Sequence, residues 1–220
     1  MLKLIPPSTE QINEILKIYF SSEGNKMNNS LSNLFTQLNN IDKYEILIKA
    51  VSINQIYSTA ILNIFPVVEK IFANTESLEN YSTNDYVELV DKITKVEWID
   101  KNNKMQKRNN LSFSSKYVHF LSGRNIPIYD SYVWILITGY LNQNSLKKIR
   151  TNQPRNYKEF YSIYNNFVAT FNLDAFDVYK IDKYLWQYCD ILLTQISKDK
   201  NVQQRNKAKA ILRKEIKEGE

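Results

Sequence analysis

A lysine and an aspartate, Lys116 and Asp130, are the residues of this chain whose types and spacing could do covalent chemistry. Lys116 stands in an apolar stretch with helical periodicity, and Asp130 follows the Ile-Pro-Ile-Tyr segment of residues 126–129, where a helix N-cap would stand. A neutral amine can attack an electron-poor sugar carbon and become an iminium, while a carboxylate relays protons and stabilises the developing positive charge. The pair therefore predicts nucleophilic catalysis by an amine.

The chain between the two residues is long enough to bring them together. A helix over residues 116–121 carries the chain about 9 Å away at about 1.5 Å per residue, and extended residues at about 3.3 Å each can return it. We expect Lys116 in the first turn of its helix and Asp130 at the start of the next one. The partial positive charge of helix N-termini would then favour an ionised carboxylate and a neutral amine, and could also bind phosphate.

Each of these residues also has a purely structural interpretation. Asp130 suits a helix cap with no further role, and Lys116 suits an exposed lysine on a helix surface. His119, one turn after Lys116, suits a packed or capping histidine better than a catalytic base. Three aromatic residues nearby are more typical of a core than of a base-stacking surface: Tyr117, Phe120 and Tyr132.

The elements that must position these residues are helical in their hydrophobic pattern. Apolar residues recur every three to four positions, except over residues 100–110, which are polar, basic and rich in Asn, as in a loop. The pattern contains neither alternating strands nor a two-residue hairpin signal. The predicted fold class is therefore all-α. The expected helices cover residues 8–19, 42–50, 54–72, 84–96, 113–121, 132–137, 157–171 and 179–196.

Length and charge indicate the domain organisation and the class of partner. The 220 residues are expected to form one domain over residues 1–197, followed by a basic helix or tail over residues 198–220. The formal net charge is +6. This excess favours an anionic partner such as a phosphate backbone, although solvated loops and a solubilising tail explain it equally well. Two basic clusters lie before the tail: Lys101, Lys104, Lys107 and Arg108, and then Lys147, Lys148, Arg150, Arg155 and Lys158.

The cysteine and histidine content excludes several kinds of site. A single cysteine, Cys189, cannot make an internal disulfide, and with a single histidine, His119, it cannot build a Cys/His zinc site. We therefore expect no metal and no cofactor. The N-terminus has no signal-peptide pattern and the chain has no run of eighteen apolar residues, so the sequence predicts a cytoplasmic location and no membrane partner. The oligomeric state stays open.

Two segments resemble a known family. The stretch Lys-Tyr-Val-His-Phe-Leu from Lys116, followed by Ile-Pro-Ile-Tyr-Asp up to Asp130, resembles the lysine helix and aspartate segment of the helix-hairpin-helix DNA glycosylases, and most closely their 8-oxoguanine branch. Residues 52–60 resemble the buried early helix of that fold. The resemblance implies a helical bundle around a central cleft, and the activity of a bifunctional DNA glycosylase and abasic-site lyase of base excision repair. Lys116 would be the Schiff-base nucleophile, and Asp130 its activating carboxylate.

The resemblance also implies roles for residues that would touch the DNA. The substrate would be duplex or single-stranded DNA with an oxidised or modified purine, flipped out of the stack. The glycine-rich hairpin that grips a phosphate in that family is replaced here by Arg108-Asn-Asn-Leu-Ser-Phe-Ser-Ser115, and the four-cysteine run of the iron–sulfur branch is absent. The further candidates for DNA or substrate binding are Asn54, Gln55, Tyr57, Lys104, Lys107, Arg108, Ser114, Ser115 and His119, with Trp134, Tyr184 and Trp186 as walls of a base pocket.

Two other functions fit the same sequence. A catalytically silent nucleic-acid-binding module would use the basic clusters without any reactive lysine. An α-helical protein-interaction domain would not bind DNA even at low salt. Trapping with sodium borohydride separates the enzyme from both, because only a reactive lysine leaves a covalent adduct with DNA.

Overall fold

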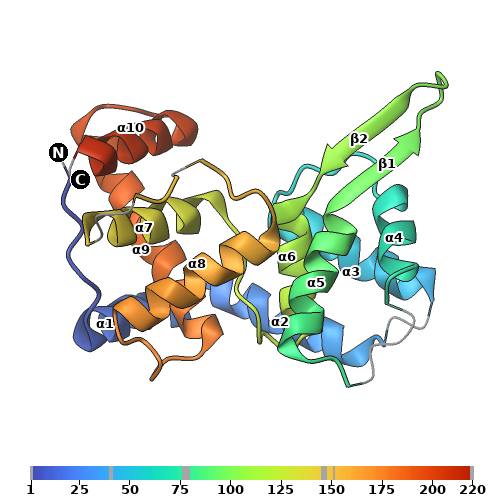
Figure 1. The fold of residues 1–220 in the computed structure, drawn as a ribbon, viewed down its shortest axis with the longest axis horizontal. Helices are drawn as coiled ribbons and strands as arrows, with labels where there is room; N and C mark the ends of the chain where they lie inside the picture. The colour runs from blue at the N-terminus through green and yellow to red at the C-terminus, as the bar shows by residue number, and fades with distance from the viewer. Residues whose placement is uncertain (1, 40–41, 76–79, 145–147, 151, 219–220) are drawn as a thin grey trace. The chain divides into compact units, whose positions relative to one another are not determined.

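The computed structural model describes residues 2–39, 42–75, 80–144, 148–150 and 152–218 (Figure 1). Over these residues the chain is mostly helical, with ten helices and one two-stranded sheet, which confirms the helical class. In chain order the elements are α1 (Thr9–Phe20), α2 (Glu23–Gln37), α3 (Lys43–Ile56), α4 (Phe65–Phe72), α5 (Thr83–Thr94), β1 (Lys95–Ile99), β2 (Met105–Asn109), α6 (Leu111–Leu121), α7 (Ser131–Gln143), α8 (Tyr157–Thr170), α9 (Val178–Asp199) and α10 (Arg205–Glu218).

The chain divides into two compact units. The central unit contains Glu23–Tyr129 and Asn156–Lys158, and the terminal unit contains Met1–Ser22, Asp130–Arg155 and Glu159–Glu220. Lys116 therefore belongs to the central unit and Asp130 to the terminal unit.

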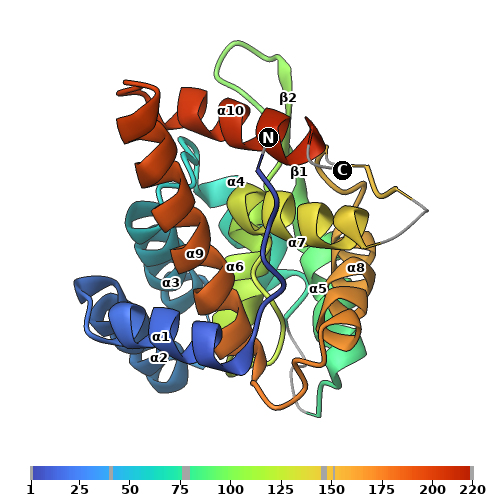
Figure 2. The same cartoon turned by 90° about the vertical axis from the view of Figure 1, so that its left-hand side faces the viewer.

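The terminal unit is built around the long helix α9. Helices α1, α7 and α10 all pack against it, and α10 also packs against α7, where Gly139 lies against Ile216. The extended N-terminal segment crosses α7 (Figure 2), and Gln143 at the end of α7 accepts a hydrogen bond from Leu4 N and donates one to Leu2 O. The basic C-terminal residues thus include a packed helix.

The central unit places α6 among three other helices. Helices α2, α3 and α5 pack against α6, and α3 also packs against α4. Nine of the eleven residues of α6 are buried, Lys116 among them. The unit therefore holds its lysine helix in its core.

A β-hairpin between α5 and α6 was not expected from the sequence. The helix expected over residues 84–96 ends at Thr94 in the structure, as α5. Strand β1 follows and pairs antiparallel with β2, so that Glu97 stands opposite Lys107 and Ile99 opposite Met105. In the turn, Asp100 accepts backbone hydrogen bonds from Asn102 and Lys104. The prediction of a loop was right for residues 100–104, which form the turn, and wrong for residues 105–109. Strand β2 is polar apart from Met105, so its sequence lacks the alternation that marks a half-buried strand. Figure 1 shows the hairpin projecting from the helices of the central unit.

The predicted helix over residues 54–72 is in fact two helices. Helix α3 ends at Ile56, and α4 begins at Phe65 with Pro66 in its first turn. Asn54 holds the connecting loop: its side chain accepts hydrogen bonds from Thr59 Oγ1 and Ile61 N, and donates one to Ile61 O. Proline is well tolerated in a first turn and poorly in a helix interior, so Pro66 suits the start of α4 and not the interior of one continuous helix.

Across the described residues, every helix is either too short or too polar to span a lipid bilayer.

Candidate functional site

The candidate nucleophile Lys116 is a buried residue of α6. Its side chain is on the sixth residue of the helix, so it lies in the second turn and not in the first turn as the sequence suggested. Only 3% of the residue is exposed. Its Nζ donates to Ser112 Oγ at 2.6 Å and lies 3.4 Å from Ser112 O. The interpretation of Lys116 as an exposed helix lysine is therefore wrong.

An aromatic ring faces the same amine. Lys116 Nζ lies 5.3 Å from the centroid of the Tyr57 ring, at cation–π distance. Tyr57 follows α3, and its hydroxyl donates to Asn28 Oδ1 on α2. Asn28 is itself held, because its Nδ2 donates to Gly24 O at 2.8 Å. Side chains from α2, α3 and α6 thus fix the surroundings of the lysine.

Ser115 and His119 of α6 bind the segment of residues 126–129, which follows the turn at the end of α6. Ser115 Oγ accepts a hydrogen bond from Tyr129 N at 3.0 Å and lies 3.3 Å from Tyr129 O. His119 is fully buried, and its Nδ1 donates to Ile126 O at 2.6 Å. Both residues therefore anchor the segment before Asp130, which is a positioning role.

Ser114 is the neighbouring serine and has a different environment. It is fully buried, and its hydroxyl has no hydrogen-bond partner among the described residues. Neither Ser114 nor Ser115 is exposed in this structure.

Asp130 caps α7 in the terminal unit, as the sequence predicted. Its Oδ1 accepts a hydrogen bond from Tyr132 N at 2.8 Å. Lys209 on α10 is close by, because it donates to Ser131 Oγ and its Nζ lies 4.4 Å from the Tyr132 ring centroid. Burial lowers the pKa of Lys209, and the charge of Asp130 opposes that lowering. Burial, assisted by Asp130, raises the pKa of Cys189 to about 12.

The other candidates for DNA binding are spread over the central unit. Asn54 holds the α3–α4 loop, while Gln55 is exposed at the end of α3. Lys104 is exposed in the hairpin turn, and Lys107 forms an ion pair with Glu97 at 2.8 Å. Arg108 donates to Thr59 O at 3.2 Å and so ties the hairpin to the α3–α4 loop.

The second basic cluster lies between α7 and α8, except for Lys158 in the first turn of α8. Lys147 is outside the described residues. Lys148 donates to Asn142 O at 2.7 Å, and Arg155 forms an ion pair with Glu159 at 3.1 Å. At least these two cations serve local structure.

Sequence reasoning missed two partners of the lysine, Ser112 and Asn28. Ser112 stands four residues before Lys116 on the same helix, so helical spacing alone could have identified it. Asn28 lies in α2, a helix that the sequence analysis did not anticipate, and reaches the lysine only through Tyr57. Trp134 and Tyr184, considered as pocket walls, are buried, whereas Trp186 is 40% exposed.

Within the part of the chain that the structure describes, no cluster of three His, Cys, Asp or Glu side chains could hold a metal ion.

Comparison with known proteins adds one match. Residues 11–125, just over half of the chain, match the family HI_0787_N, whose description is "N-terminal domain". The chain belongs to the HI_0787_N family. The HI_0787_N segment runs from α1 to the turn after α6, so it contains Lys116 with Ser112 and Tyr57 but ends before Asp130. No curated protein and no solved structure matches the chain.

Proposed function

We propose that this chain is a DNA glycosylase with an associated lyase activity, built on a helix-hairpin-helix glycosylase-like fold. The observation that carries the proposal is the buried amine of Lys116, held by Ser112 and faced by the ring of Tyr57. A lysine costs free energy to bury, and burial favours the neutral form of an amine, which is the form that attacks carbon. The resemblance of residues 116–130 to the lysine and aspartate segments of these glycosylases points to the same residue.

Chain connectivity supports Asp130 as the partner of the lysine. Ser115, which precedes Lys116, is hydrogen-bonded to Tyr129, and Tyr129 is joined to Asp130 by a peptide bond. Consecutive Cα atoms are about 3.8 Å apart. The carboxylate therefore belongs to the residue that directly follows the segment anchored beside the lysine.

The proposed reaction begins with attack of the Lys116 amine on C1′ of a flipped nucleotide. The bond from C1′ to the base nitrogen breaks, and the base leaves with its electron pair and takes up a proton. The attached amine loses its proton through Asp130 and the sugar ring opens, which leaves a Schiff base between Nζ and C1′. Loss of a proton from C2′ then expels the 3′ phosphate by β-elimination, and water releases the lysine.

Borohydride trapping tests this proposal directly. Full-length protein is mixed with sodium borohydride and two duplex oligonucleotides, one with 8-oxoguanine and one with a preformed abasic site. Lys116→Met should abolish the covalent adduct. Lys49→Met is the matched control, because Lys49 is a second buried lysine of the same unit and should not be needed for the adduct.

The outcomes are distinct. An adduct of wild-type yield in the Lys116→Met variant would overturn the assignment of the nucleophile. No adduct with the wild type on either duplex, together with salt-dependent DNA binding, would favour the catalytically silent module instead. A thermal unfolding curve for each variant establishes that a lost adduct does not reflect a lost fold.

A further inference from the structure

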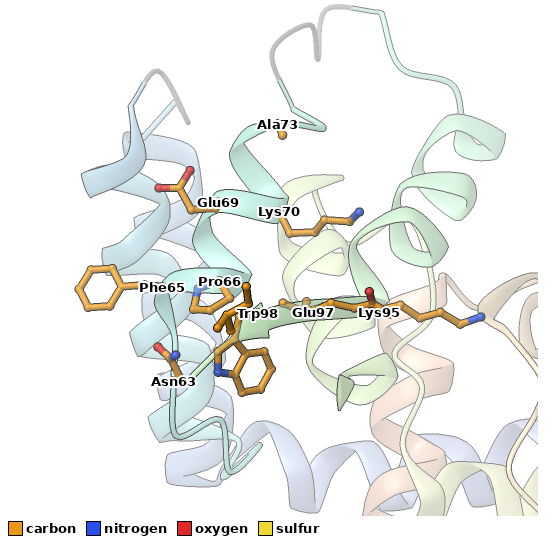
Figure 3. Close-up of a pocket in the computed structure, with 11 residues that line it drawn as sticks. Asn63, Phe65, Pro66, Glu69, Lys70, Ala73, Lys95, Glu97 and Trp98 are labelled. Carbon is orange, nitrogen blue, oxygen red and sulfur yellow. The ribbon is translucent and has the colours of Figure 1, made fainter. Parts of the chain in front are cut away.

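A cavity of about 830 Å³ lies between α4 and β1, within the central unit (Figure 3). All five residues of β1 line it, together with residues from Asn63 to Ala73 on and before α4. Pockets that bind small organic ligands have volumes of about 300–1,000 Å³. The cavity is therefore large enough for one nucleotide, and none of the residues assigned to the lysine site lines it.

Apolar and aromatic groups form much of its wall. Phe65 and Ile99 are both 65% exposed, and Trp98 is half-buried. All three line the cavity, as does Pro66. Figure 3 shows that the Phe65 and Trp98 side chains come from different elements, α4 and β1. An aromatic ring that is accessible at an open cavity, as that of Trp98 is, is typical of a surface that stacks a planar ligand.

The charges of the cavity are unbalanced in favour of cations. Its two carboxylates are neutralised by lysines that do not line it: Glu69 pairs with Lys43 at 2.6 Å, and Glu97 pairs with Lys107 at 2.8 Å. Its two lysines, Lys70 and Lys95, are exposed, and neither forms an ion pair with any carboxylate of the described residues. Within the part of the chain that the structure describes, the cavity thus presents two ammonium groups outside any ion pair.

We propose that this cavity binds a segment of single-stranded nucleic acid, with an unstacked base against Trp98 and its phosphates at Lys70 and Lys95. Stacking on aromatic rings combined with a cationic track is the general mode of single-strand binding, and it needs no particular base sequence. An extended peptide added to the free edge of β1 would use the same cavity but would not need the two lysines. The available positive charge favours the nucleic acid.

Fluorescence anisotropy of a labelled oligothymidylate of about ten nucleotides tests the stacking. This probe contains neither a modified purine nor an aldehyde, so it reports the cavity and not the lysine chemistry. Trp98→Ala should weaken binding about 5- to 150-fold, which corresponds to the free energy of about 1–3 kcal/mol for loss of one stacked base. Trp98→Phe should recover part of the affinity, and Trp186→Ala, which removes an exposed tryptophan of the terminal unit, should bind as the wild type does.

The salt dependence of the same binding tests the two lysines. For single strands the logarithm of affinity falls with that of salt concentration with a slope of about −0.7 per neutralised phosphate. The double variant Lys70→Ala with Lys95→Ala should reduce the magnitude of this slope by about 1.4. Both lysines are exposed, so the fold should survive their removal. Lys26→Ala, which removes an exposed lysine on α2, should leave the slope unchanged.

Several results would overturn the proposal. These are no binding of oligothymidylate at low salt, a Trp98→Ala affinity within twofold of the wild type, an unchanged slope in the double-lysine variant, or binding of an extended peptide in place of the oligonucleotide. Lys116→Met should bind oligothymidylate normally. Failure of the borohydride adduct would therefore leave the cavity proposal standing, and failure of oligothymidylate binding would leave the glycosylase proposal standing.

Discussion

Lys49 provides a quantitative check of the central unit, because it is a lysine with no exposed surface. It lies on α3, and its Nζ donates to Leu38 O at 2.7 Å and lies 4.9 Å from the centroid of the Phe35 ring. Burial lowers the pKa of Lys49 to about 8, while the charge of Glu45 opposes the lowering. We expect this residue to make the stability of the protein depend on pH.

The sign and the size of this pH dependence follow from the difference between the pKa of Lys49 in the folded and in the unfolded chain. The unfolded chain binds the proton with the ordinary pKa of 10.5, and the folded chain with a pKa of about 8. Between these values the unfolded state holds more protons, so stability rises as the pH rises. Below pH 8 the folded state must keep a buried ammonium ion, which costs about 3 kcal/mol at 1.36 kcal/mol per pKa unit. Between pH 7 and pH 10 the contribution of Lys49 to the free energy of unfolding should therefore rise by about 2.5 kcal/mol.

Urea unfolding of the wild type and of Lys49→Met, from pH 7 to pH 10, measures this contribution as a difference. The difference is needed because other groups act in the opposite direction. Burial raises the pKa of Tyr140 and of Cys189, so their folded forms keep protons that the unfolded chain loses in alkali. These contributions are common to both proteins and cancel.

The stability of the wild type relative to Lys49→Met should therefore increase by about 2.5 kcal/mol over this range. Lys92→Met, a change of an exposed lysine on α5, is the control and should give a flat difference. A flat difference for Lys49→Met as well would refute the reasoning, because it would mean that the buried amine keeps the proton affinity of the unfolded chain.

Three further predictions concern the lysine site and the terminal unit. Ser112→Ala removes the hydroxyl that lies 2.6 Å from Lys116 Nζ. In single-turnover trapping this change should slow adduct formation about tenfold, the equivalent of about 1.4 kcal/mol. An unchanged rate would exclude a role for that hydrogen bond. Asp130→Asn keeps a good helix cap, so it should reduce base release while leaving the melting temperature unchanged. Asp130→Ala should reduce base release and also lower the free energy of unfolding by about 1 kcal/mol. Equal base release by Asp130→Asn and the wild type would exclude proton relay by Asp130. Gly139→Ala would place a Cβ 2.7 Å from Ile216 Cγ2 and should destabilise the protein by about 1–3 kcal/mol, seen as a lower melting temperature unless α10 shifts.

Much of the helical architecture could be predicted because its causes are local. Asp130 acts as an N-cap at the predicted position, Asp42 caps α3 at the start of the helix expected over residues 42–50, and the apolar periodicity of α9 identifies it almost to its ends. The hairpin could not be predicted in this way. Its stabilising pairs are cross-strand contacts such as Glu97 with Lys107, and these form only after β1 and β2 have met.

The candidate site shows the same division between local and long-range information. Residue type and spacing identify Lys116. Ser112 stands four residues earlier on the same helix, so helical spacing also predicts its contact with the lysine. The groups that give the amine its environment are different, because Tyr57 follows another helix and Asn28 orients it from a third. Each of these polar residues alone has a sequence context typical of an ordinary helix surface. Only the packing of α2, α3 and α6 joins them into a partly buried polar chain that ends on the buried amine of Lys116, and the hydrogen bond from Ser112 and the ring of Tyr57 offset part of the free-energy cost of burying that amine.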